Sequence, residues 1–305
     1  MKLKYLVVGA GAIGGAIGAY LADAKKDVTF IDLEPGVQAI KEHGFHMTTP
    51  HADYFVPAKA EVAENYHDTP DVVFICVKTY FLDSIIPLLD RVCTPDTLVL
   101  PLCNALDIGS AIEAKMHTKA QVIGGVAYVA VVQEAPGHTR QKLPFYRVVF
   151  GPRNGAPITK LMWKVRQDML DAGMAAELVP DAVCGALRKF VRVSTIAGAE
   201  CYFNCNIGPI RDDPEKMAFI RGLANEIVEI ANTRGTPFYD DALEDFETAM
   251  SEVFPEYACS MKHDMDLGRP MELDTMLFDV YDMGKSLGLE MKHYGILARH
   301  FGHIK

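Results

Sequence analysis

The feature that most constrains this chain is a glycine-rich turn that directly follows its first apolar run. The run covers residues 5–8, and helix-forming residues continue beyond the turn to residue 24. This order predicts a strand, a tight turn and a helix. The glycines let the backbone turn sharply and let a diphosphate approach the helix N-terminus without a Cβ in the way. The sequence therefore predicts a dinucleotide-binding turn that consists of Gly9, Ala10, Gly11, Ala12, Ile13 and Gly14.

An acidic residue stands where the second strand of such a unit ends. Residues 28–31 form an apolar run, and Asp32 follows it, 18 residues beyond Gly14. A carboxylate at this point can accept hydrogen bonds from both ribose hydroxyls of an adenosine and would repel a 2′-phosphate. We therefore expect NAD(H) to be favoured over NADP(H). The alternative interpretation is a solvated aspartate at the start of an ordinary turn.

The first half of the chain alternates short apolar runs with helical stretches, which is typical of buried parallel strands. The further runs cover residues 72–77, 98–102, 122–126 and 147–150. From about residue 182 helical patterns replace them, at residues 184–202, 214–233, 239–253 and 273–288. We expect an α/β Rossmann-type domain with a parallel sheet at residues 1–180, followed by an all-α domain at residues 181–305.

The composition excludes several classes of protein. A length of 305 residues suits two domains, and a formal net charge of −10 argues against binding to nucleic acid or to an anionic membrane. No segment approaches the roughly 20 consecutive apolar residues of a membrane span. The seven cysteines, several of them inside apolar runs, indicate a reducing compartment, so we expect a cytoplasmic protein. We expect no metal site, because His263, Asp264 and Asp266 lack a spacing typical of ligands.

Several further residues of the chain occur in the same order as in a known family. They are Lys78, Asn104, the pair Pro136–Gly137, Lys189, and Ser260–Met261 followed by Glu272 twelve residues after the serine. With these residues the chain resembles the ketopantoate reductase (2-dehydropantoate 2-reductase) family over nearly its full length. The resemblance implies an NAD(P)-dependent oxidoreductase that interconverts a small 2-keto acid and a 2-hydroxy acid by hydride transfer.

The resemblance also implies a role for each residue. Lys189 is the general acid, since an ammonium group can neutralise the alkoxide that hydride delivery leaves and can supply the proton. Asn104 and Glu272 belong to the same catalytic cluster and also to the cofactor site, to which Lys78 contributes near the adenosine phosphate. Ser260 helps to hold the substrate carboxylate, and Glu272 receives the far hydroxyl of the substrate. The plain alternatives are a solvated lysine and a first-turn helix acid.

Two substrate-binding positions depart from the family's pattern. The family places asparagines four and eight residues after the lysine, where this chain has Val193 and Ala197. Apolar side chains there would leave a polar substrate without hydrogen-bond partners, so we expect a more apolar 2-keto or 2-hydroxy acid. In a shifted helix register, the lost hydrogen bonds could come from Ser194, Thr195 or Asn204.

Two other functions stay open at this stage. One is a true 2-dehydropantoate 2-reductase of pantothenate biosynthesis with a rebuilt pocket, and the other is a non-catalytic nucleotide-binding regulator. The regulator is disfavoured because a sensor needs no proton donor beside the nicotinamide. One residue favours the other cofactor: the positive charge of Lys78 suits the phosphate of NADP(H). Beyond the small acid substrate, we expect a homodimer as a possible assembly.

Overall fold

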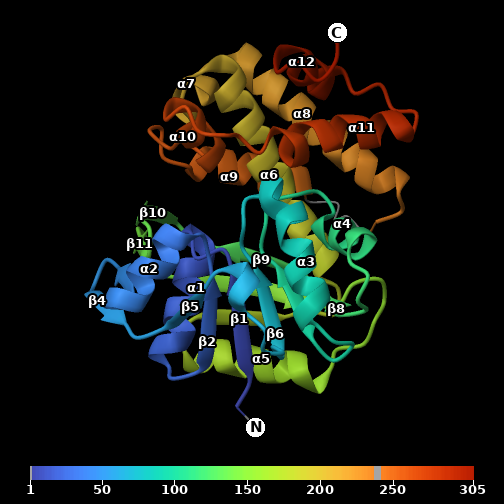
Figure 1. Cartoon of the computed structure of the whole chain (residues 1–305). Helices are drawn as coiled ribbons and strands as arrows, with labels where there is room; N and C mark the ends of the chain where they lie inside the picture. Colours follow the sequence, from blue (N-terminus) through green and yellow to red (C-terminus); the bar gives the residue numbers. More distant parts are fainter. Residues whose placement is uncertain (1, 237–241) are drawn as a thin grey trace. The chain divides into compact units, whose positions relative to one another are not determined.

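A computed structural model describes residues 2–236 and 242–305 (Figure 1). The chain forms two compact units. Unit 1 consists of Met1–Cys103 and Asp107–Gly185, and unit 2 consists of Asn104–Leu106 and Ala186–Lys305. The sequence predicts a division after residue 180. The structure divides the chain inside the first turn of helix α6 (Ala182–Phe203) and assigns a short segment of the first half to the second unit.

Unit 1 is built on a six-stranded sheet in which every pairing is parallel. The strand order along the chain reverses between β1 and β6, and sheets of this kind bind ligands beyond the carboxyl ends of the strands at such a reversal. From one edge to the other, the strands are β5 (Lys59–Glu61), β2 (Asp27–Ile31), β1 (Lys4–Val8), β6 (Val72–Ile75), β7 (Leu98–Pro101) and β8 (Gln121–Val122).

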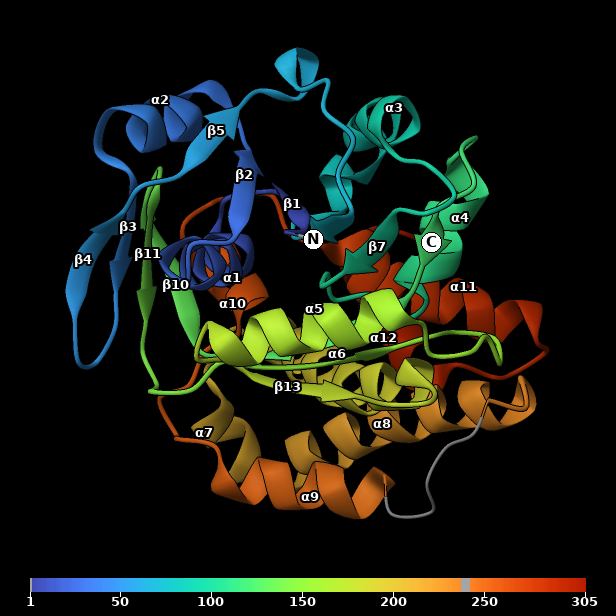
Figure 2. The same ribbon diagram turned by 90° about the horizontal axis from the view of Figure 1, so that it is seen from below.

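Helix α1 (Ala12–Asp23) contacts strands of the parallel sheet and of a second sheet (Figure 2). It comes close to the strands because glycines face them: a Cβ on Gly18 would stand 2.2 Å from the ring of Phe30. The aromatic side chains of this core are completely buried, and each such side chain contributes roughly 1.5–3 kcal/mol to stability. The other helices of the unit are α2 (Glu34–His43), α3 (Leu82–Val92), α4 (Ile108–Lys115) and α5 (Lys160–Asp171). A 3₁₀ turn, η1 (Ala63–Asn65), lies between β5 and β6.

Two smaller sheets complete unit 1, and they correct part of the sequence-based prediction. The apolar run at 122–126 is two strands, because the chain leaves β8 at Ile123 and continues as β9 in another sheet. The run at 147–150 pairs with β9 antiparallel and does not extend the parallel sheet. Apolar runs predict burial but carry no information about the partner strand. The two sheets are β10 (Val131–Ala135), β11 (His138–Gln141), β3 (Phe45–Thr48) and β4 (Asp53–Val56), and β13 (Ala175–Leu178), β12 (Arg147–Gly151) and β9 (Gly124–Tyr128).

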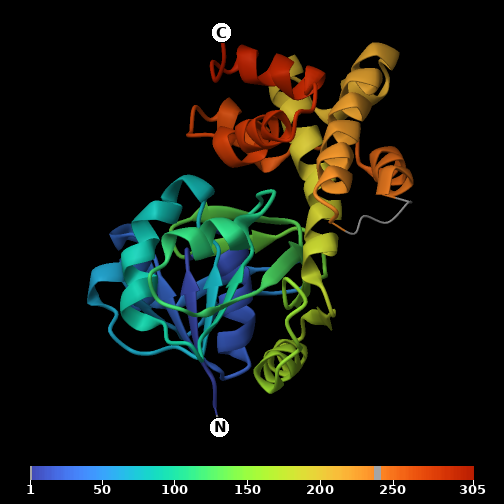
Figure 3. The same ribbon diagram turned by 90° about the vertical axis from the view of Figure 1, so that its right-hand side faces the viewer.

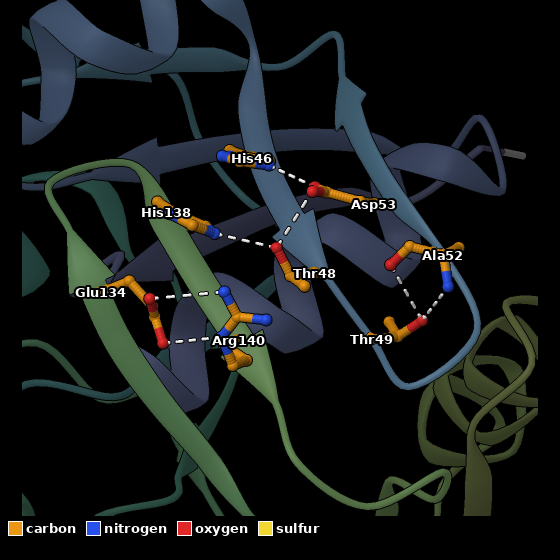
Figure 4. A network of polar contacts seen from close by, with 8 residues as sticks. All are labelled: His46, Thr48, Thr49, Ala52, Asp53, Glu134, His138 and Arg140. Carbon is orange, nitrogen blue, oxygen red and sulfur yellow. Dashed lines mark hydrogen bonds and ion pairs between the residues drawn. The ribbon is translucent and has the colours of Figure 1, made fainter.

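Polar side chains fix the register of the four-stranded sheet (Figure 4). Strands β3 and β11 run parallel, with His46 opposite His138, and the two imidazole rings stack with centroids 3.7 Å apart. Asp53 accepts hydrogen bonds from His46 and from Thr48, and Thr48 is 2.9 Å from His138. A slip of one residue would separate these partners, so the network specifies the pairing.

Unit 2 contains helices and no strand within the described residues 186–236 and 242–305 (Figure 3). Helix α8 begins and ends where the sequence predicts, and it packs against four other helices. The predicted helix at 273–288 begins instead with a π-helical segment, and residues 239–241 of another predicted helix lie outside the described residues. After α6, the elements are α7 (Ile207–Arg211), α8 (Pro214–Thr233), α9 (Ala242–Glu252), α10 (Ser260–Asp266), η3 (Asp274–Phe278), α11 (Asp279–Ser286) and α12 (Lys292–His300).

Side chains at the helix ends explain why α8 and α12 form where they do. Asp213 accepts the backbone N–H groups of Glu215 and Lys216, and Pro214 occupies the first position of α8. The buried carboxylate of Glu226 on α8 accepts the backbone N–H of His293 and Tyr294 in the first turn of α12. In the part of the chain that the structure describes, we find no helix with the length and apolar surface to cross a bilayer.

Candidate active site

The glycine turn of unit 1 follows β1 and has the backbone that its sequence predicts. Gly9 has φ +96°, a left-handed conformation that L side chains rarely adopt, and its N–H donates to the Ile31 carbonyl over 2.8 Å. A Cβ on Gly9 would also stand 2.9 Å from the backbone nitrogen of Val77. Glycine at this position therefore lets the turn lie against the loop that follows β6.

The other two glycines of the motif differ in what surrounds them. A Cβ on Gly14 would stand 2.0 Å from the carbonyl oxygen of Gly9, so this glycine lets α1 pack onto the turn. A Cβ on Gly11 would meet only the Gln133 side-chain oxygen at 3.7 Å, which leaves open space above the turn. Gly11 is the N-cap of α1 and provides no side-chain cap. Uncapped amides beside open space fit the diphosphate of a dinucleotide.

Asp32 and Lys78 follow neighbouring strands of the same sheet. Asp32 directly follows β2, and its carboxylate packs on the first turn of α2, where a Cβ on Gly36 would stand 2.2 Å from Oδ2. Burial raises the pKa of Asp32, and a hydrogen bond from the Leu33 backbone opposes this shift. Lys78 lies half-buried after β6, directly before the short helical turn η2 (Thr79–Phe81).

The predicted catalytic lysine and asparagine both belong to unit 2 and are hydrogen-bonded. Lys189, in the second turn of α6, donates from Nζ to Oδ1 of Asn104 over 3.1 Å. Burial lowers the pKa of Lys189 to about 8, with a smaller contribution from the positive charge of Arg192. A lysine with this pKa exchanges its proton near neutral pH, which general acid–base catalysis requires.

The remaining predicted residues of unit 2 lie on its C-terminal segments. Ser260 is the first residue of α10 and is exposed, whereas Glu272 is buried and lies two residues before η3. π-Helical turns occur frequently at functional sites because they shift the side chains beside them. Ser194 holds this turn by donating from Oγ to the carbonyl oxygen of Met276 over 2.6 Å.

The next residues of α6 include the hydroxyl groups that were considered as replacements for the family's two asparagines. Ser194 and Thr195 are completely buried and bonded to backbone carbonyls, Thr195 to that of Val191 over 2.8 Å. Helical register turns both hydroxyls into the core, where these backbone bonds engage them. Val193 is half-buried, and Ala197, 1% exposed, lies in the helical core. Asn204 is exposed at the end of α6.

Two further charged residues lie on the helix that carries Lys189 and are not predicted from the sequence. Arg192 lies three residues beyond Lys189 on α6, a spacing that places both on one side of a helix and that could have indicated it. Glu200, on the same helix, is 0% exposed. Burial raises the pKa of Glu200 to about 7. No local pattern distinguishes such a residue from an ordinary surface glutamate.

Potential metal ligands do not gather in the structure. Within the described ranges, no three His, Cys, Asp or Glu side chains lie close enough together to hold an ion. Of the acidic residues near Ser260, Asp266 pairs with Lys262 and Asp264 is buried.

A glycine turn after the first strand of a parallel sheet, with uncapped helix amides beside open space, is typical of dinucleotide-dependent enzymes. Comparison with known protein families supports this class of enzyme. The family described as ketopantoate reductase PanE/ApbA matches residues 5–155, and its C-terminal domain matches residues 184–305. The chain belongs to the ketopantoate reductase family, and it is an NAD(P)-dependent oxidoreductase that acts on CH–OH groups.

Relatives and solved structures resemble the chain over almost its whole length. A 2-dehydropantoate 2-reductase of a Nostoc species is 24% identical, with 96% of this chain and 92% of the relative covered. A ketopantoate reductase of the PanE/ApbA family from Ralstonia eutropha superposes with a TM-score of 0.88 at 23% identity, covering 97% and 96% of the two chains. The ternary structure of D-mandelate dehydrogenase with NADH and anilino(oxo)acetate has a TM-score of 0.86 at 19% identity, with the same coverage.

Proposed function

We propose that the protein is an NAD(H)-dependent reductase of small 2-keto acids, or in reverse a 2-hydroxy acid dehydrogenase, with Lys189 as its general acid. The observation that carries this proposal is the 3.1 Å hydrogen bond from Lys189 to Asn104, at a position where the pKa of the lysine falls to about 8. Proton donors are most effective when their pKa lies near the working pH. When bound, the nicotinamide cofactor supplies the hydride.

Lys189 has two tasks in this reaction. Its ammonium group donates a hydrogen bond to the keto oxygen and stabilises the negative charge that develops there. The proton then moves from Nζ to that oxygen, so a hydroxyl forms and the lysine is left as a neutral amine. Asn104 holds Nζ in place through Oδ1. Arg192 adds a second positive charge on this side of α6, which favours an anionic substrate such as a carboxylic acid.

The preferred substrate is a 2-keto acid with an apolar side chain. Val193 provides an apolar surface one turn beyond Lys189, and the hydroxyls of Ser194 and Thr195 are engaged elsewhere. A polar substrate hydroxyl would therefore lose hydrogen bonds on entering the site. The D-mandelate dehydrogenase structure, which holds anilino(oxo)acetate, supports a keto acid of this kind on this fold.

The test is turnover of NADH with a panel of 2-keto acids, measured as loss of reduced-nicotinamide absorbance. We expect kcat/KM for benzoylformate or 2-ketoisovalerate to exceed that for ketopantoate by about tenfold or more, because a substrate hydroxyl without a partner disfavours ketopantoate. If ketopantoate with NADPH is the best pair, the protein is a 2-dehydropantoate 2-reductase, the second candidate, which the name of the Nostoc relative favours. Absence of turnover with every acid would favour the regulator.

The cofactor preference depends on Asp32. We expect kcat/KM with NADH to exceed that with NADPH on the order of tenfold or more, because a carboxylate beside a 2′-phosphate is a like-charge contact. The isosteric Asp32→Asn variant removes this charge and should narrow the preference for NADH by raising kcat/KM with NADPH. The KM for the keto acid should stay unchanged and serves as the control. An unchanged ratio in the variant would mean that Asp32 has no role in the choice of cofactor.

A further inference from the structure

Glu200 is a buried carboxyl group that the proposed reaction does not use. Its side chain is 0% exposed, and Oε2 accepts the backbone N–H of Cys259 over 2.7 Å. Its other oxygen, Oε1, is buried without a hydrogen-bond partner within the described residues. A buried carboxyl with one oxygen unmatched is unfavourable by itself. The hydrogen bond from the Cys259 backbone offsets part of this cost.

The residue that Glu200 holds lies directly before Ser260. Cys259 is the N-cap of α10, and its Sγ accepts the backbone N–H of Lys262 over 3.3 Å. The turn that contains Ser260 is thus held by two hydrogen bonds of Cys259. The backbone N–H of Cys259 attaches the turn to Glu200 on α6, and its thiol accepts the N–H of Lys262 within the turn. The position of the Ser260 hydroxyl follows from where this turn is attached.

Helix α6 carries both Lys189 and Glu200. The two residues are eleven positions apart, which is about three turns of an α-helix, so they project from the same side of it. An α-helix of this length is stiff, so attaching the Ser260 turn at Glu200 fixes its distance from the lysine.

We propose that Glu200 is a positioning residue for substrate binding, which fixes the Ser260 turn to the helix that carries Lys189 through its bond to the Cys259 backbone. This inference rests on the proposed role of Ser260 in holding the substrate carboxylate. Glu200 itself touches neither the substrate nor the cofactor. Its removal weakens the binding of the keto acid and leaves the chemical step nearly unchanged.

Glu226 offers a matched control in the same unit. It is also a buried glutamate whose carboxylate accepts backbone N–H groups, in this case those of His293 and Tyr294 at the start of α12. Glu200→Leu leaves the backbone N–H of Cys259 without an acceptor, and Glu226→Leu removes the acceptor of the two backbone N–H groups and of the His293 ring. A general loss of packing would affect both variants alike, whereas a positioning role belongs to Glu200 alone.

The experiment compares KM and kcat in the full-length enzyme. We expect Glu200→Leu to raise the KM for the keto acid on the order of tenfold, with kcat and the KM for NADH changed less than about twofold. Glu200→Gln, which keeps an acceptor oxygen of the same reach, should restore most of the affinity. In a Ser260→Ala background, Glu200→Leu should add no further increase. Glu226→Leu should lower thermal stability and leave KM unchanged.

Hydrogen exchange provides a readout that does not need activity. Amides of residues 259–262 should exchange faster in Glu200→Leu than in the wild type or in Glu226→Leu. Unchanged exchange there, a KM shift of equal size in both leucine variants, or a full effect of Glu200→Leu in the Ser260→Ala background would each overturn the proposal. If the wild type turns over no 2-keto acid, the proposed function fails, and the exchange measurement still decides whether Glu200 holds the turn.

Discussion

Replacing Lys189 with alanine is expected to lower kcat for 2-keto acid reduction by about 10²–10⁴-fold, the usual contribution of a general acid. The alkoxide that forms in the reaction would lose both its proton donor and the nearby positive charge. Steady-state kinetics with a saturating keto acid measures this loss. The affinity for NADH, measured separately by fluorescence titration, should change by less than about twofold, because the glycine turn belongs to unit 1.

A matched control exists on the same helix. Arg188, the residue before Lys189, pairs with Asp245, and an Arg188→Ala variant removes a neighbouring positive charge without touching the proton donor. Its kcat should stay within about twofold of the wild type, since such ion pairs contribute little. Equal losses in both variants would mean that the charge of this helix turn, and not the proton of Lys189, supports the reaction.

The pH dependence follows from the same lysine. Burial, and then the charge of Arg192, lowers the pKa of Lys189 to about 8. Reduction needs the protonated form, so its kcat/KM should be constant below this pH and fall about tenfold per pH unit above it. Oxidation of the hydroxy acid needs the neutral amine and should show the opposite slope. The inflection should move to higher pH in Arg192→Gln, and two profiles of the same slope would exclude Lys189 as the proton donor.

A pair of alanine substitutions in the glycine turn should separate folding from cofactor binding. In Gly14→Ala the new Cβ would meet the Gly9 carbonyl oxygen at 2.0 Å and the Cys76 Cβ at 2.8 Å. Neither atom can move without shifting β1, α1 or β6, so we expect a loss of about 3 kcal/mol in stability. Thermal unfolding should detect this as a fall in Tm of roughly 5–10 °C.

Gly11→Ala is the control for that result and has a different expected effect. Its Cβ would meet no atom closer than 3.7 Å, so the fold should lose at most about 1 kcal/mol, through a poorer N-cap. The Cβ would stand in the space through which the diphosphate approaches the amides of α1. We expect weaker NADH binding by about tenfold or more, measured by calorimetry. Normal NADH binding by Gly11→Ala would place the dinucleotide away from this turn.

Local patterns predicted the parallel sheet and the long helices because their causes are local. The apolar runs at 5–8 and 72–77 are strands β1 and β6, and the periodic segment at 214–233 is α8 with the same bounds. Strands with polar or mixed composition, such as β3 and β11, did not stand out from loops. Each forms a hairpin with its neighbour along the chain, β4 or β10. The parallel pairing of β3 with β11 joins two distant hairpins, and no window of sequence contains both.

The residues of the candidate site also fall into those that the sequence predicts and those whose contacts only the structure shows. The glycine motif and the lysine at position 189 can be found from sequence, since turn chemistry and family spacing mark them. Asn104 was placed by family resemblance, and the structure adds its hydrogen bond to the lysine. The backbone bonds of the Ser194 and Thr195 hydroxyls could not be predicted, because helical phase in the folded unit decides whether a side chain faces the core.

By itself, the sequence determined the glycine turn, the apolar strands of the parallel sheet and the long helix α8, because backbone preference and hydrophobic periodicity act within a few residues. Only the tertiary structure decided which groups lose their water and which partners they meet. The lowered pKa of Lys189 and the bond of Glu200 to Cys259 both arise from residues far apart in the chain. Solvation and charge depend on what surrounds a group in space, and folding alone sets those surroundings.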